Sequence, residues 1–261
     1  MKVIGQVKTG SKIYRVVESA GSIRLRPLPA EKDLRRYYEA YHHRLAERFD
    51  RRREQQRLRA IKRFRSSGRL LDVGAGRGYF VKAALAEGSF RAEGVELSQS
   101  ACRWAKKHLG LKLMPGEFLS LKLKSKTYQV ISLHSTLEHF PDPGRVLRRA
   151  VSLLKPGGLL VFSVPNLDSF EYFLSRHSPY PYTGFILEHL NYFNHRLVGK
   201  LLADLRLKPL LITSRHYSPI ESLRLSPFII GNLAKRILEG TDWGGRLGWG
   251  NVLYVYAQKP G

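Results

Sequence analysis

The chain contains very little sulfur and no cluster of cysteines. Cysteine occurs once, at Cys102, and methionine occurs twice among 261 residues. A single cysteine excludes an intrachain disulfide framework, and it also excludes zinc or iron–sulfur sites built from several cysteines. A chain of this length buries roughly 70 to 75% of its extended surface, so an apolar core can hold it together without such crosslinks.

Long apolar runs are also missing. The densest run, residues 159–165, has the length of a strand and falls far short of the ~20 residues of a membrane-spanning helix. The opening residues, MKVIGQVKTGSK, lack the apolar stretch of a secretory signal. The sequence therefore predicts a cytoplasmic location.

Acidic residues are scarce relative to basic ones. The chain has 21 Asp and Glu against 45 Lys and Arg, and its net charge of +24 favours anionic partners. Residues 44–65 are the most basic stretch, and their apolar residues recur at helical spacing. This pattern predicts an amphipathic helix with a cationic polar face. Such a face is either simply solvated or contacts an anionic partner, which would be RNA or an acidic membrane surface.

Beyond residue 66 the chain alternates between strand-like and helix-like segments. This alternation predicts an α/β fold, a Rossmann-like, seven-stranded, mostly parallel sheet with helices on both faces and an antiparallel final strand. We expect strands at residues 69–73, 91–95, 111–114, 130–133, 159–164, 209–213 and 252–258. We expect helices at residues 79–87, 99–109, 143–154 and 195–205.

Two segments interrupt the alternation. Residues 165–193 are rich in aromatic residues, and residues 219–249 contain a possible helix at 228–238 followed by a glycine-rich stretch. Long connections in compact domains tend to cover functional sites, so we interpret both segments as substrate lids. The predicted organisation is thus a basic N-terminal arm over residues 1–66 and a main domain over residues 67–261 that carries the lids.

The most specific motif is a glycine-rich turn at residues 70–78, LLDVGAGRG, placed between an apolar strand and a helix. Glycines allow positive φ angles and close approach of a ligand, and the following helix offers unpaired N–H groups. The Gly-x-Gly-x-Gly spacing differs from the Gly-x-Gly-x-x-Gly turn that binds dinucleotides. The turn also lacks the Gly-Lys-Ser/Thr of a P-loop, which excludes a nucleotidase of that type.

A carboxylate, Glu96, follows the second predicted strand, 24 residues beyond Asp72. An acid at the carboxyl end of that strand can accept hydrogen bonds from both hydroxyls of a ribose. The turn and the acid together indicate a site for an adenosine-type ligand without a diphosphate.

With these motifs the sequence resembles the class I S-adenosylmethionine-dependent methyltransferases. Residues 70–78 match their first motif, residues 94–98 match their second, and residues 128–166 resemble the stretch through their fourth and fifth strands. The motifs LEHFPDP and LLKPGGLLVFSVPN most resemble those of the subgroup of ubiquinone-biosynthesis O-methyltransferases and polysaccharide-cluster methyltransferases. The resemblance covers about residues 66–215 and implies S-adenosylmethionine as the cofactor.

The resemblance also implies roles for individual residues. The glycines would line the methionine portion of the cofactor, Asp72 would place its ammonium group, Glu96 would bind the ribose, and Leu97 would pack on the adenine. The cofactor-binding residues expected in this way are Asp72, Gly74, Gly76, Gly78, Glu96, Leu97, Glu117, Phe118 and His134.

Two histidines are candidate general bases, His139 and His189, because a neutral imidazole can take a proton from an alcohol or phenol near pH 7. In the ubiquinone-type enzymes, an acid three residues before the pair Glu138-His139 helps to bind a divalent cation. This sequence has Ser135 there, so we expect no metal. Residues 14–29 are faintly similar to a zinc-ribbon prefix in which Ser19 and Ser22 replace the cysteines, which predicts a small β-rich prefix without metal.

Three functions remain open. The first is O-methylation of a small-molecule, sugar or lipid-linked hydroxyl. The second is RNA methylation with the basic helix holding the substrate, although residues 133–136 are not the Asn/Asp-Pro-Pro-aromatic tetrapeptide of many base N-methylating enzymes, and Cys102 is badly placed for attack on a pyrimidine. The third is a non-catalytic binding module.

Overall fold

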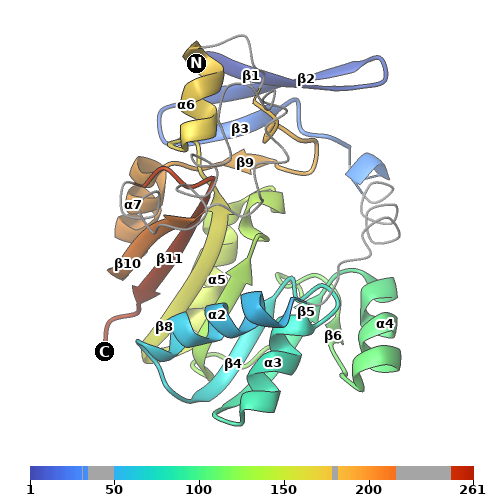
Figure 1. Ribbon diagram of the computed structural model, residues 1–261, viewed down its shortest axis with the longest axis vertical. Coiled ribbons are helices and arrows are strands. Elements are labelled where there is room, and N and C mark those ends of the chain that lie inside the picture. The colour runs from blue at the N-terminus through green and yellow to red at the C-terminus, as the bar shows by residue number, and fades with distance from the viewer. Residues whose placement is uncertain (31, 35–49, 178–181, 216–247) are drawn as a thin grey trace, which may run out of the picture.

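A seven-stranded sheet forms the centre of the computed structural model, which describes residues 1–30, 32–34, 50–177, 182–215 and 248–261 (Figure 1). Its strand order is β10-β11-β8-β7-β4-β5-β6. The strands are β4 (Gly68–Val73), β5 (Phe90–Glu96), β6 (Met114–Pro115), β7 (Tyr128–His134), β8 (Leu154–Pro165), β10 (Lys208–Arg215) and β11 (Val252–Gln258). The predicted fold class is confirmed, because β4 to β8 pair in parallel and β11 is antiparallel to both of its neighbours.

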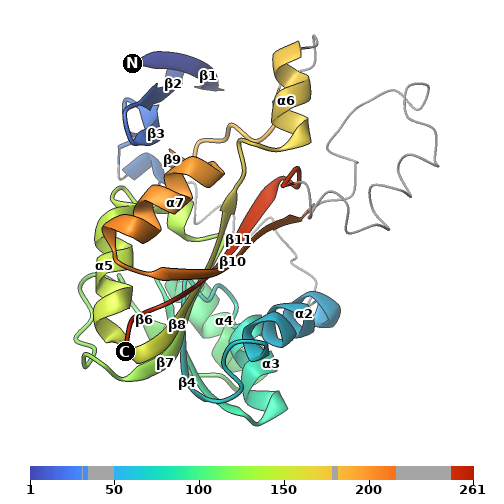
Figure 2. The same cartoon turned by 90° about the vertical axis from the view of Figure 1, so that its left-hand side faces the viewer.

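Helices cover both faces of this sheet, as Figure 2 shows. On one face lie α2 (Arg51–Lys62), α3 (Tyr79–Glu87) and α4 (Gln99–Leu109), and on the other lie α5 (Pro143–Leu153) and α7 (His195–Asp204). Two apolar cores result: Leu58, Ile61 and Phe80 belong to the first, and Leu147 and Leu202 belong to the second. The predicted helices 79–87 and 99–109 have the observed bounds.

A second, antiparallel sheet lies beyond the edge at which β4, β7 and β8 end (Figure 1). It has the order β1-β2-β3-β9 and contains β1 (Lys2–Thr9), β2 (Lys12–Ser19), β3 (Ser22–Arg26) and β9 (Asn191–Tyr192). Three of these strands, β1 to β3, lie within residues 2–26, and the hydroxyls of Ser19 and Ser22 are joined by a hydrogen bond of 2.9 Å. Between β8 and β9 the chain forms α6 (Phe170–His177), inside the first segment interpreted as a lid.

The described part of the predicted basic helix is α2. Asp50 caps its first turn by accepting a hydrogen bond from the Arg53 N–H at 3.1 Å, and Leu58 and Ile61 are buried against the sheet. Its acidic residue Glu54 is buried as well, with 1% of its surface exposed. Glu54 therefore lies on the buried face of α2, whereas the exposed positions include Arg51, Arg52 and Arg59. Residues 44–49 and the possible helix 228–238 lie outside the described residues.

None of the described helices is long and apolar enough to cross a membrane.

Candidate functional site

The glycine-rich turn after β4 has the backbone that its sequence predicts. Gly74, Gly76 and Gly78 have φ angles of +73°, +54° and +80°, in the region that favours glycine. A Cβ atom at Gly74 would lie 2.4 Å from the Thr136 side chain, and one at Gly78 would lie 2.6 Å from Leu111. A Cβ atom at Gly76 would meet nothing within 4 Å. The turn therefore presents open space at Gly76, where a ligand can approach the backbone.

Glu96, at the end of β5, connects to this turn directly. Its Oε2 accepts a hydrogen bond from the Gly76 N–H at 2.7 Å, and its Oε1 accepts one from the Ser98 N–H at 2.7 Å. A carboxylate can accept about four hydrogen bonds, which is the capacity that recognition of a ribose hydroxyl requires. Leu97 is 61% exposed beside it, which leaves an apolar surface of the kind on which an adenine ring can pack.

Asp72 lies at the bottom of the site, with 4% of its surface exposed. The Ser132 hydroxyl donates a hydrogen bond to Asp72 Oδ1 at 2.7 Å. Burial raises the pKa of Asp72 to about 7, although the hydrogen bond from Ser132 opposes the shift. A cationic group of a ligand beside Asp72 would restore the ionised form.

Glu117 and Phe118, the two residues expected near the adenine, differ in exposure. Glu117 is exposed and accepts a hydrogen bond from the Ser120 hydroxyl at 3.1 Å. Phe118 is 2% exposed and packs in the apolar core, with the Arg149 guanidinium 5.6 Å from its ring centroid. Its contact with adenine stays a prediction.

His134 ends β7, next to the strand that leads into the turn. Its ring meets that of Phe80 edge to face, with 4.9 Å between the centroids. Both ring nitrogens are shielded from solvent, and neither has a hydrogen-bond partner among the described residues. Burial, followed by the charges of Arg57 and Arg53, lowers the pKa of His134 well below its usual value. Because buried polar atoms without partners are costly, these nitrogens indicate where a ligand would bind.

The candidate bases His139 and His189 come together although 50 residues separate them. The short helix η1 (Leu137–His139) carries His139, and the ring centroids of the two histidines are 5.3 Å apart. The backbone N–H of Leu190 donates to the Glu138 carbonyl at 3.0 Å, and that of Leu25 donates to the Leu190 carbonyl at 3.1 Å. The small sheet therefore helps to hold the segment with His189 against η1.

The two histidines and Glu138 form a buried polar cluster, called the Glu-His-His cluster below. One ligand atom from each residue lies within 4.8 Å of the others, a spacing compatible with a bound metal ion. His139 Nδ1 contacts the Glu188 carbonyl at 2.8 Å, whereas Glu138 Oε2 and His189 Nδ1 have no partner among the described residues. Burial raises the pKa of Glu138 to about 8, and burial followed by the charge of His139 lowers that of His189 to about 3.

Helix α2 contributes residues that the sequence did not assign to the site. Glu54 accepts hydrogen bonds from Arg53 Nε at 3.0 Å and from Arg57 Nη1 at 3.1 Å. The charges of Arg57 and Glu54 act on Asp72. Leu58 and Ile61 of α2 belong to the same apolar core as Leu70 of β4 and Val130 of β7. A signal existed, because Glu54 precedes Leu58 by four residues and Ile61 by seven and therefore shares their buried helix face.

A glycine turn and a strand-end acid lie at one edge of a parallel sheet, near buried polar atoms for which the described residues supply no partner. These features define a nucleoside-binding α/β enzyme. The chain matches the family model described as "Methyltransferase domain" over residues 33–209. It belongs to that family and is an S-adenosylmethionine-dependent methyltransferase. The residues present fit this cofactor, since the turn is open at Gly76 and Leu97 is exposed. Among the described residues, Asp72 forms no ion pair and its Oδ1 is bound by the neutral Ser132 hydroxyl. The ring nitrogens of His134 have no hydrogen-bond partner among those residues either.

Curated relatives match part of the chain. Ubiquinone biosynthesis O-methyltransferases of Coxiella burnetii (strain RSA 493) and Bordetella avium are 33% identical over 102 and 105 residues, or 37% and 38% of this chain. Each alignment spans 43% of the relative's length.

Solved structures share the fold. A methyltransferase from Archaeoglobus fulgidus is 20% identical with a TM-score of 0.57, covering 85% of this chain and 100% of that one. A possible histamine N-methyltransferase from Thermotoga maritima is 20% identical with a TM-score of 0.55, covering 87% and 95%.

Proposed function

We propose that the protein methylates a hydroxyl group of a small molecule, a sugar or a lipid-linked compound. The single observation that carries this proposal is the Glu-His-His cluster, in which His189 Nδ1 is a buried imidazole nitrogen without a partner among the described residues, beside Glu138, whose pKa burial raises to about 8. Methylation of an alcohol or phenol releases a proton, and a positioned base lowers the barrier to that release. The named O-methyltransferase relatives support the same chemistry at modest identity.

The reaction divides between the two halves of the site. The glycine turn, Asp72 and Glu96 would hold the methyl donor, which would supply its methyl carbon to the hydroxyl oxygen of the acceptor, with the donor's sulfur as the leaving group. The hydroxyl proton passes to the Glu-His-His cluster, where His189 offers an available nitrogen and the Glu188 carbonyl orients His139. The remaining requirements are alignment of the acceptor oxygen with the methyl group of the donor and exclusion of water from the site. Such a direct transfer needs no covalent intermediate with the protein.

The test is a transfer assay with S-adenosylmethionine labelled on its methyl group. Hydroxylated aromatic compounds, nucleotide sugars, prenyl-linked sugars and RNA are offered as acceptors, and the methylated atom is identified by NMR. We expect a methyl ether, and we expect His139→Ala and His189→Ala each to lower kcat by roughly 10²- to 10⁴-fold with unchanged S-adenosylmethionine affinity. The exposed His108 on α4 provides the control, since His108→Ala should leave kcat unchanged. A product methylated on carbon or nitrogen would contradict the proposal.

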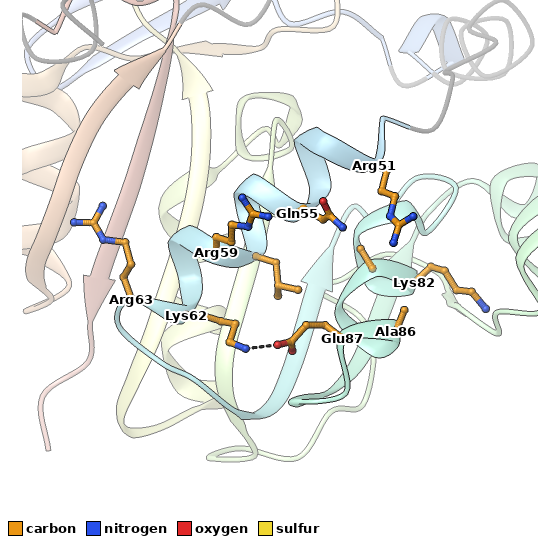
Figure 3. A pocket seen from close by; sticks show the side chains of 10 residues that line it. Arg51, Gln55, Arg59, Lys62, Arg63, Lys82, Ala86 and Glu87 are labelled. Atoms are coloured by element: carbon orange, nitrogen blue, oxygen red, sulfur yellow. Dashed lines mark hydrogen bonds and ion pairs between the residues drawn. The ribbon is translucent and has the colours of Figure 1, made fainter. Parts of the chain in front are cut away.

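RNA methylation is the second candidate, and one observation favours it. A groove of about 860 Å³ runs between α2 and α3, and Figure 3 shows Arg51 and Lys82 at one end of it. Its basic lining residues are Arg51, Arg59, Lys62, Arg63 and Lys82. RNA held there should dissociate steeply with salt, with a slope of about −0.7 per neutralised phosphate on a single strand. An acidic membrane surface on the same basic face would instead require anionic vesicles for binding.

A further inference from the structure

A second cavity lies on the other side of α2, between this helix and the strands β10 and β11. Its volume is about 320 Å³. It is called the arginine pocket here, because four arginines line it together with two tyrosines. The lining residues are Asp50, Arg52, Arg53, Gln56, Arg57, Ala60, Arg215, Tyr254 and Tyr256.

The positive charge of the arginine pocket is only partly neutralised by the protein. Asp50 caps the helix, and the buried Glu54 binds both Arg53 and Arg57. Arg52 and Arg215 are exposed and form no ion pair with any described residue. Four guanidinium groups less these two carboxylates leave an excess of two positive charges. The buried Nε of Arg57 also lacks a hydrogen-bond partner in the described part of the chain.

The strand register places this pocket beside the site of methyl transfer. Tyr254 of β11 is paired with Ser163 of β8, and Ser163 is paired with His134 of β7. Two strand spacings of about 4.8 Å therefore separate Tyr254 from His134, a distance of about 10 Å. Burial, followed by the charges of Arg57 and Arg53, lowers the pKa of His134. The positive charges of the arginine pocket therefore act on a residue at the end of β7.

Guanidinium groups bind phosphate oxygens in pairs through their planar N–H donors, and they stay charged at all physiological pH values. The Tyr256 hydroxyl adds a donor, since burial raises the pKa of Tyr256 to about 12 and keeps it protonated. We propose that the arginine pocket binds the diphosphate group of the acceptor, which is then a diphosphate-linked sugar or prenyl compound. This inference rests on the proposed function, because it assigns a substrate class to the same site.

The excess of two positive charges matches the two negative charges of a diphosphate diester such as a nucleotide sugar, and it offsets most of the charge of a prenyl diphosphate, which is a monoester with up to three. The distance of about 10 Å to His134 leaves room for a sugar or a short prenyl unit between the diphosphate and the methylated hydroxyl. The groove between α2 and α3 is different in kind. It is larger and open along the helix, and Lys62 is paired there with Glu87 (Figure 3).

The test measures binding by calorimetry with the full chain and without turnover. Inorganic pyrophosphate reports the shared chemistry, UDP-glucose reports a nucleotide-sugar source, and farnesyl diphosphate reports a lipid source. The pocket variant is Arg52→Gln/Arg215→Gln, in which both exposed side chains lose their charge. The matched control is Arg51→Gln/Arg59→Gln, which removes the same charge from the face of α2 that lines the other groove. Thermal unfolding checks that both variants fold like the parent.

We expect the parent to bind pyrophosphate and at least one of the two esters, and the pocket variant to bind them at least about tenfold more weakly. The control variant should stay within about twofold of the parent, and S-adenosylmethionine affinity should be the same in all three proteins. The ester that binds more tightly identifies the source of the diphosphate.

Four results would overturn the inference. The first is that the parent binds neither pyrophosphate nor the esters, and the second is that both variants bind them equally weakly. The third is that a single-stranded RNA binds more tightly than these ligands and does so through Arg51 and Arg59. The fourth is that the pocket variant also loses affinity for S-adenosylmethionine. The last would mean that the pocket holds the carboxylate of the cofactor. None of these results depends on which atom is methylated, so failure here differs from failure of the O-methylation proposal, in which the product lacks a methyl ether.

Discussion

The backbone N–H of Gly76 donates a hydrogen bond to the side-chain carboxylate of Glu96 at 2.7 Å. This bond joins the turn after β4 to the end of β5, two segments that the sequence predicted would bind different parts of one ligand. The carboxylate is thereby oriented before any ligand arrives. Orientation of this kind reduces the ordering that binding would otherwise require.

Loss of the Glu96 carboxylate should weaken S-adenosylmethionine binding. We expect Glu96→Ala to cost roughly 1–3 kcal/mol of binding free energy, the scale of a lost hydrogen bond to a charged group. Calorimetry on the variant and the parent measures this cost. Glu93→Ala is the control, because Glu93 lies on the same strand but contacts Arg69 and Tyr128. Unchanged affinity in Glu96→Ala would remove the ribose assignment.

Alanine substitutions at Gly76 and Gly88 can distinguish the effect of backbone strain on stability from the effect of a ligand contact on affinity. Both have positive φ angles, +54° and +87°, and a Cβ atom on either would meet no atom within 4 Å. Alanine at each position should therefore cost a similar free energy of unfolding, roughly 1–2 kcal/mol, through strain alone. Only Gly76→Ala should also abolish S-adenosylmethionine binding, because its methyl group would occupy the open side of the turn. Equal affinities in the two variants would show that the cofactor does not approach Gly76.

The ionisation of Asp72 should make cofactor binding depend on pH. Its pKa is about 7 in the folded protein, so the carboxylate that would hold the cofactor's ammonium group forms only as the pH rises through 7. We expect S-adenosylmethionine affinity to increase between about pH 5.5 and 7.5, and we expect Asp72→Asn to remove this dependence. Calorimetry across that range tests both expectations.

The buried carboxyl group of Asp72 should also lower the stability of the ligand-free protein at neutral pH. The folded state keeps the proton of Asp72 between its usual pKa of 3.8 and about 7, whereas the unfolded state releases it. The free energy of unfolding therefore falls as the pH rises through this window, by a few kcal/mol at most. Asp72→Asn should thus unfold at a higher denaturant concentration than the parent at pH 8, and at a similar one near pH 4. A variant that is less stable than the parent at pH 8 would contradict the assignment of the shift to burial.

The sequence predicted the segments whose signals are local. Helix α4 has its predicted bounds because Ser98 caps its first turn and Gly110 ends it, and the turn at Gly74 to Gly78 follows from glycine spacing. The pairing of His139 with His189 could not be read from local pattern, since it depends on packing across 50 residues. Strand β9 was missed for the same reason: it has two residues and exists only because β3 pairs with it.

The last prediction concerns the Glu-His-His cluster, for which we expect no metal requirement. Ser135 stands where the resemblance places a third acid, and His139 already contacts the Glu188 carbonyl and a backbone group of Ser135. Within the described part of the chain, Glu138 Oε2 and His189 Nδ1 are then the two potential metal-ligand atoms of the cluster without a hydrogen-bond partner. Two such atoms are fewer than the three protein ligands of a catalytic zinc site and include too few oxygens for magnesium. Turnover should therefore survive dialysis against EDTA, and elemental analysis of the parent and of Glu138→Gln should find the same trace metal content. If the parent instead carried stoichiometric metal that Glu138→Gln lost, and EDTA abolished turnover until the metal was restored, the three residues would be its ligands, and proton transfer to a free His189 would have to be abandoned.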